Sequence, residues 1–164
     1  HDIAIEVFAK VKQKFPQLKL KIAGEGQEEI FLRDVAKMCG VENSVEFLGY
    51  QKNLVPLYKK ARLTLMTSSH EGFPNALIES LTLGTPIVSI DCPTGPREII
   101  QDGINGFLVN DDKDMLEQKI IETLNQEWNI EIINKTVSNH KNEKIINDYD
   151  DFFNNLLIST KKIY

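Results

Sequence analysis

The chain has 164 residues, of which 41% are hydrophobic and 26% charged, as in an ordinary globular protein with enough material for one well-packed domain. Nineteen Lys and Arg against 24 Asp and Glu give a net charge of -5, without a basic block. This balance argues against a dedicated nucleic-acid partner, and no apolar run approaches the ~20 residues of a membrane span.

Helical and strand patterns alternate along the chain. Apolar residues recur at helical spacing in one set of segments, and they alternate or cluster in the other. The expected helices cover residues 3–15, 28–40, 53–61, 74–84, 96–102 and 111–125, followed by a mainly helical tail from about residue 128. The expected strands cover residues 18–24, 44–49, 62–69, 86–91 and 106–109. This order predicts an α/β domain with a Rossmann-like, mostly parallel sheet flanked by helices.

Ligands of an open α/β sheet bind beyond the carboxyl ends of its strands, where helices also begin. That geometry selects four glycine-containing or polar loops: residues 24–26, 49–50, 68–75 and 91–96. Glycine lets backbone N–H groups approach a ligand closely, and a helix N-terminus favours phosphate. In the last loop, the turn before Pro96 is either a purely structural turn or a second helix start near the ligand.

Two glutamates, Glu71 and Glu79, stand eight positions apart in the stretch "SSHEGFPNALIESLTLGTP". Pro74 suits the first turn of a helix, which leaves Glu71 in the loop at the strand end and Glu79 inside the helix. Helical side chains lean toward the N-terminus, so both carboxylates can face one ligand with the N–H groups of residues 73–76 between them. Carboxylates suit sugar hydroxyls and helix N–H groups suit phosphate, which fits a nucleotide sugar. The alternative, a loop charge and a solvated helix residue, stays open on pattern alone.

The wording "HEGFPNALIE" resembles the E-x7-E motif of retaining glycosyltransferases of family four (glycosyl transferases group 1), which have the GT-B fold. The likeness continues through "IAGEG", "VEFLGY", "GTPIVSIDCPTGPREII" and "DGINGFLV", in the family's order and over residues 1 to about 125. The resemblance implies that residues 1–164 are the donor-binding domain, the C-terminal half of a GT-B fold. The acceptor-binding N-terminal domain is absent from the sequence.

The resemblance also implies roles for individual residues. Glu71 would be the catalytic-site carboxylate that contacts hydroxyls of the transferred sugar, and Glu79 would bind the ribose. The loop at Gly24 would border the diphosphate, and Gly49 and Tyr50 the base. The complete donor-binding set is Gly24, Gly26, Gly49, Tyr50, Gly72, Phe73, Pro74, Asn75, Ala76 and Glu79.

The reaction implied by the family is retaining transfer of a hexose from a nucleotide-diphosphate sugar to a glycan or lipid-linked acceptor, as in polysaccharide biosynthesis. The wording "DCPTGPREII" resembles members that transfer galactose- or N-acetylgalactosamine-type sugars from UDP, and a glucose-type sugar is the third hexose considered. No metal or other cofactor is expected, and Asp111 or Asp112 is expected to cap a helix. Cys39 and Cys92 form no CxxC pair, which fits a cytoplasmic protein, peripheral to the inner face of the membrane if its acceptor is lipid-linked.

The sequence also departs from the family pattern. An Arg and a Lys that bind the donor diphosphate, and the usual first strand, would precede His1 and are not in the sequence. We therefore expect a piece that folds without catalysing and that has an unpaired strand edge. Three alternatives remain open: a sugar-nucleotide epimerase of the same fold, a glycogen-type phosphorylase, and a non-catalytic nucleotide-binding domain.

Overall fold

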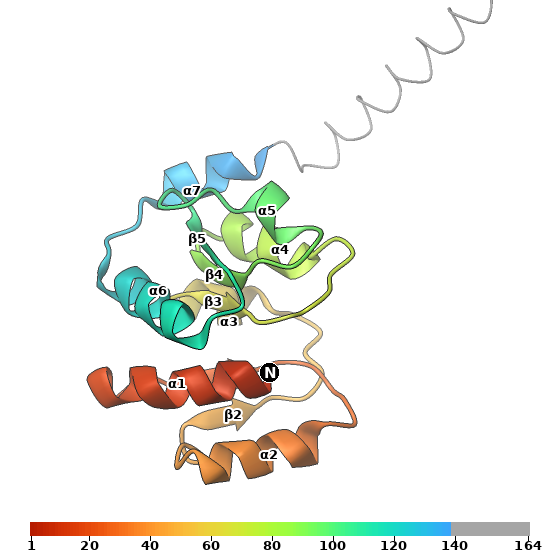
Figure 1. Ribbon diagram of the computed structural model, residues 1–164. Coiled ribbons are helices and arrows are strands. Elements are labelled where there is room, and N and C mark those ends of the chain that lie inside the picture. The colour runs from red at the N-terminus through yellow and green to blue at the C-terminus, as the bar shows by residue number, and fades with distance from the viewer. Residues whose placement is uncertain (139–164) are drawn as a thin grey trace, which may run out of the picture.

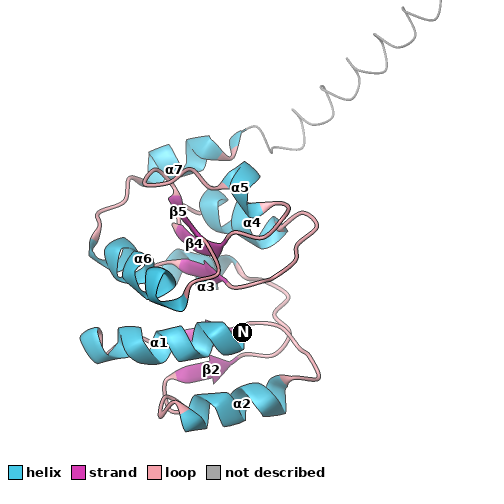
Figure 2. Cartoon of the chain, viewed as in Figure 1, coloured by secondary structure: helices cyan, strands magenta, loops and turns pink. Residues whose placement is uncertain are grey.

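The computed structural model describes residues 1–138 as a layered arrangement of helices and strands (Figures 1 and 2). The helices are α1 (Asp2–Lys14), α2 (Glu29–Met38), α3 (Val55–Lys60), α4 (Asn75–Thr82), α5 (Pro96–Ile99), α6 (Lys113–Asn125) and α7 (Ile130–Thr136). The strands are β1 (Leu20–Ile22), β2 (Val45–Phe47), β3 (Thr64–Met66), β4 (Ile87–Ile90) and β5 (Gly106–Val109). The predicted order of elements is confirmed, and β5 has the predicted bounds.

All strand pairs among these elements are parallel, which confirms the predicted α/β class. They form two sheets, one with the order β1-β2 and one with the order β3-β4-β5. The predicted parallel sheet is thus divided, and no backbone ladder joins the β1-β2 pair to the three other strands. All four residues of the central strand β4 are buried, as expected of a strand covered on both faces.

Helix α1 packs against both sheets through two sets of side chains. Val7 and Val11 belong to a core cluster with residues of β4, β5 and α6. Ile5 and Phe8 belong to a second cluster with residues of α2 and β2. A third cluster, built around Leu77, joins α4, β4, α5 and α7. Helix α1 therefore connects the two halves of the described chain.

Helix α5 is shorter than predicted. The side chain of the buried Asn105 bonds backbone groups that a further helical turn would have paired. The helix ends at Ile99, where we expected it to continue to residue 102. The Asn105 side chain donates to the Ile99 carbonyl at 3.0 Å and to the Thr136 hydroxyl at 2.9 Å. Its oxygen accepts from the Gln101 amide at 2.8 Å. The predicted cap of α6 is confirmed at Asp112.

Candidate functional site

The loops selected from the sequence follow the carboxyl ends of the strands. The connections after β2 and β3 leave their strands on the same side of the molecule, on the right in Figure 1. The loop at residues 67–74 leads from β3 into α4, and the loop at residues 91–95 leads from β4 into α5. This side is where ligands of parallel α/β sheets bind.

The two glycine loops of the smaller sheet contact each other. The Gly24 amide donates to the Gly49 carbonyl at 2.9 Å, in an isolated antiparallel bridge. Both residues have positive φ, +133° and +63°, which favours glycine over side-chain-bearing residues. The Tyr50 amide donates to the Glu25 carboxylate at 3.3 Å, and the Tyr50 ring is exposed. The predicted diphosphate and base contacts, Gly24 and Gly49-Tyr50, thus lie next to each other.

Glu71 lies in the loop before α4, with its side chain half-buried. The hydroxyl of Thr94, in the loop after β4, donates to the Glu71 backbone carbonyl. Gly95 packs so closely on Pro74 that a Cβ at this position would lie 2.5 Å from Pro74 Cδ. Directly before Glu71 in the same loop, His70 has its ring Nδ1 3.2 Å from the Ser69 hydroxyl. Contacts from the loop after β4 therefore hold the Glu71 loop in place.

The start of α4 has no side-chain cap, because its N-cap residue is Pro74. By contrast, the side chains of Asp112 and Asn129 cap α6 and α7. Asn75 and Ala76 are exposed at this helix start. However, the Asn75 amide donates to the Phe73 carbonyl at 2.9 Å, and proline has no N–H. The expected run of N–H donors at residues 73–76 is thus incomplete at two of its four positions.

Glu79 is exposed on α4 and contacts Tyr58 of α3. Burial raises the pKa of Tyr58 to about 12, and the charge of Glu79 and a hydrogen bond with its side chain add to the shift. The neutral form of the tyrosine is therefore stabilised in the folded chain. The Tyr58 backbone carbonyl accepts from the buried Thr85 hydroxyl at 2.8 Å, which fixes the end of α3 near α4.

Tyr58 did not emerge from the sequence as a candidate site residue. It stands 21 positions before Glu79, in a short predicted helix where a half-buried tyrosine is an ordinary packing residue. Only the packing of α3 beside α4 makes the pair visible. Thr94 did belong to a selected loop, although nothing in the sequence indicated that its partner is Glu71.

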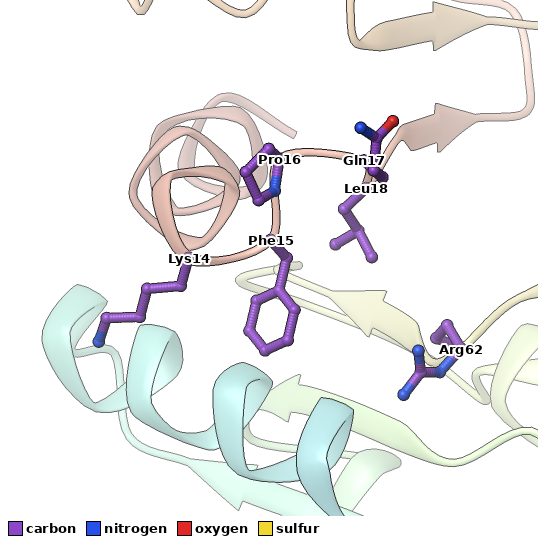
Figure 3. A pocket seen from close by; sticks show the side chains of 6 residues that line it. All are labelled: Lys14, Phe15, Pro16, Gln17, Leu18 and Arg62. Atoms are coloured by element: carbon purple, nitrogen blue, oxygen red, sulfur yellow. The ribbon is translucent and has the colours of Figure 1, made fainter.

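One cavity of about 440 Å³ lies away from all these loops (Figure 3). Its lining residues precede β1 or β3 in the chain or end α1, so it opens at the amino ends of the strands. Figure 3 shows Phe15 and Leu18 beside the cavity, with Lys14 and Arg62 at its two sides. None of the predicted site residues lines this cavity. It is an apolar hollow between packed elements and not the site selected above.

Within residues 1–138, no three His, Cys, Asp or Glu side chains gather into a group that could hold a metal ion. No helix of this part is both long and apolar enough to cross a membrane.

Parallel strands flanked by helices, with the candidate loops at the carboxyl ends of the strands, form the fold of GT-B glycosyltransferases. The chain belongs to the family of glycosyl transferases group 1, whose model matches residues 1–143. The resemblance seen in the sequence is thereby confirmed for the family and for the fold.

Two relatives illustrate the family. An uncharacterized glycosyltransferase of Methanocaldococcus jannaschii is 39% identical over 62% of this chain and 25% of its own length. The poly(glycerol-phosphate) alpha-glucosyltransferase of Bacillus subtilis is 33% identical over 75% of this chain and 17% of its own length. The chain thus spans a quarter or less of these two relatives.

Among solved structures, the pneumococcal O-GlcNAc transferase GtfA, crystallised with UDP and GlcNAc, superposes with a TM-score of 0.78. The match covers 95% of this chain and 33% of that chain, at 22% identity. At this identity the likeness supports the fold alone.

Proposed function

We propose that the complete protein is a retaining glycosyltransferase that moves a hexose from a nucleotide-diphosphate sugar to a glycan or lipid-linked acceptor. Residues 1–164 would supply the donor-binding side. One observation carries the proposal: Glu71 lies in a loop directly before a helix whose start no side chain caps. A carboxylate for sugar hydroxyls thus stands beside a partial positive charge for phosphate.

Glu71 would act on the sugar during transfer. The bond between the anomeric carbon and the diphosphate oxygen breaks, a bond to the acceptor oxygen forms on the same face of the sugar, and the proton of the acceptor hydroxyl passes to the departing diphosphate. Positive charge develops at the anomeric carbon, and a carboxylate fixed near the ring stabilises it while orienting the sugar. The nucleoside diphosphate leaves with added negative charge, which the positive end of the α4 helix dipole would offset.

The rest of the donor would lie along the neighbouring loops. Glu79 would accept hydrogen bonds from the ribose hydroxyls, with Tyr58 holding its carboxylate. Gly24 and Gly26 would border the diphosphate, and Gly49 and Tyr50 the base. The exposed Tyr50 ring, tied to the Gly24 loop through Glu25, provides a flat surface on which a base can stack. We propose that no metal takes part.

The donor and acceptor classes are supported by the relatives. The poly(glycerol-phosphate) alpha-glucosyltransferase of Bacillus subtilis, at 33% identity, supports a hexose donor and a polymeric acceptor, and the choice of UDP rests on the resemblance of residues 91–100 described above. We place the protein in the cytoplasm, because the described chain has two free thiols, Cys39 and Cys92, and a lipid-linked acceptor would bring it to the inner membrane face. The acceptor-binding part would lie in the remainder of the complete protein.

The proposal is tested with the complete protein and a panel of UDP-, GDP- and ADP-hexoses in EDTA, by release of nucleoside diphosphate. Glu71→Gln keeps the size of the side chain and removes its charge, so transfer should fall by ~10²-fold or more. Glu127→Gln, in an exposed loop between α6 and α7, is the matched control and should transfer normally. Turnover at the wild-type rate in Glu71→Gln would refute the assignment. Conversion of the donor without acceptor would indicate an epimerase instead.

Calorimetry separates the two carboxylates. Glu79→Gln should weaken UDP and UDP-hexose equally, because both contain the ribose. Glu71→Gln should weaken only the hexose conjugate. Equal losses for both ligands in both variants would contradict this division of roles.

A further inference from the structure

The loop after β4 contacts the Glu71 loop at two points that the proposed chemistry does not use. The Thr94 hydroxyl donates to the Glu71 backbone carbonyl, across 23 positions of sequence. One residue further, Gly95 lies against Pro74, so closely that a Cβ there would be 2.5 Å from Pro74 Cδ and 3.0 Å from Cγ. The two contacts enclose residues 71–74, the segment that carries the proposed sugar-binding carboxylate.

The loop that supplies Thr94 is itself anchored at both ends. Arg97 donates from Nε to Asp91 Oδ1 at 3.1 Å and from Nη2 to Asp91 Oδ2 at 2.5 Å, a two-bond pair that closes the loop. Cys92 is 2% exposed, and its thiol lies 3.4 Å from the Thr94 carbonyl. Gly95 adopts a φ of +93°, which lets the chain turn between Thr94 and α5. The Thr94 hydroxyl is therefore presented from a fixed backbone.

The Thr94 side chain is exposed, and it belongs to none of the three core clusters. Its visible interaction is the bond to Glu71. A hydrogen bond to the carbonyl of a loop residue restricts the peptide plane, and hence the direction in which that residue's side chain leaves the backbone. Catalytic groups lose activity steeply when they are displaced by ~1 Å, so such a restraint affects rate more than stability.

We propose that Thr94 is a positioning residue, which holds the Glu71 carboxylate in place for the donor sugar through its hydrogen bond to the Glu71 backbone. This inference rests on the function proposed above. It assigns to the loop at residues 91–96 a role in the reaction, in place of a structural turn or a second helix start facing the ligand.

Hydrogen exchange on the 164-residue chain tests the restraint without any donor. Thr94→Val keeps the shape of the side chain and removes the hydroxyl, while Thr94→Ser keeps the hydroxyl. In Thr94→Val, loss of the bond from the hydroxyl to the Glu71 carbonyl should favour local opening of this loop, so the protected amides among residues 71–73 should exchange about 3- to 10-fold faster. Thr94→Ser should exchange as the wild type, and so should Thr82→Val, an exposed threonine on α4. Unchanged exchange in Thr94→Val would overturn the proposal.

Kinetics of the complete protein test the consequence. Thr94→Val should lower kcat about 3- to 10-fold with little change in the KM for the donor, because Glu79 still holds the nucleotide. Thr94→Ser should restore kcat, and Thr94→Val should add nothing in a Glu71→Gln background, since Thr94 acts through Glu71. If Thr94→Val has the wild-type kcat while Glu71→Gln is impaired, this inference is overturned and the proposed function is not. Wild-type turnover in Glu71→Gln would overturn the proposed function, and the exchange result would still stand.

Discussion

Tyr58→Phe removes the hydroxyl that contacts Glu79 and leaves the ring in place. In the folded chain the pKa of Tyr58 is raised from 10.0 to about 12, first by burial and then by Glu79. The neutral form is thus favoured in the folded state. Its contribution to stability is complete below pH ~10, the unfolded value, and is lost as the pH rises through the folded value.

The magnitude follows from the size of the shift. Two pKa units correspond to about 2.7 kcal/mol at 1.36 kcal/mol per unit. The side chain is only half-buried, so solvent screening reduces this to on the order of 1 kcal/mol. Between pH 10 and 12 the wild type should therefore lose on the order of 1 kcal/mol more than Tyr58→Phe, and the two stability curves should converge.

Urea unfolding between pH 8 and pH 11.5 measures this difference. The chain has one tryptophan, Trp128, whose ring meets Phe107 edge-on at 6.0 Å and reports on the packing of α7. Tyr50→Phe is the control, because the Tyr50 side chain is 72% exposed, and its curve should run parallel to the wild type. Parallel curves for the wild type and Tyr58→Phe would refute the raised pKa of Tyr58, of which burial is the larger cause and Glu79 the smaller.

Two predictions concern stability. Gly106→Ala would place a Cβ 2.1 Å from the Ile87 carbonyl oxygen, where β5 pairs with β4, and should lower the free energy of unfolding by about 3 kcal/mol or more. Gly103→Ala, at φ +74° in open space, should cost only about 1 kcal/mol, and equal losses in urea unfolding would contradict the clash. Asp112→Ala removes the side chain that accepts from the Asp114 and Met115 amides at 2.9 and 3.0 Å, and should cost about 1 kcal/mol in thermal unfolding. Asp111→Ala is its control, and a similar loss there would contradict the cap.

Local signals in the sequence predicted the order of the elements well. The strand at 106–109 and the cap at Asp112 depend on neighbours within a few residues, and both were predicted. The end of α5 was wrong, because the Asn105 side chain takes over backbone bonds that a longer helix would have made. Its partner Thr136 lies 31 positions away and is invisible to a local pattern.

In the candidate site, too, local features were predicted and contacts between distant elements were not. The loops were selected correctly as those that follow strands, since the α/β order alone places them at one end of the sheets. The bond between Thr94 and Glu71 and the contact between Tyr58 and Glu79 could not be predicted, because each joins two elements whose relative position is set by core packing. The roles of Glu71 and Glu79 themselves remain predictions.

Helix α1 has a consequence for catalysis that is mechanical rather than chemical. The loops proposed to hold the base and diphosphate follow the strands of one sheet, whereas the loop with Glu71 follows a strand of the other. The side chains of α1 fill both cores, so in the proposed complex this helix would set the spacing between the loops that hold the two parts of one donor molecule. A substitution such as Val11→Ala, on a residue that touches no ligand, would change that spacing. The variant would therefore transfer sugar more slowly, because the nucleotide and the sugar of one donor would no longer both fit their loops.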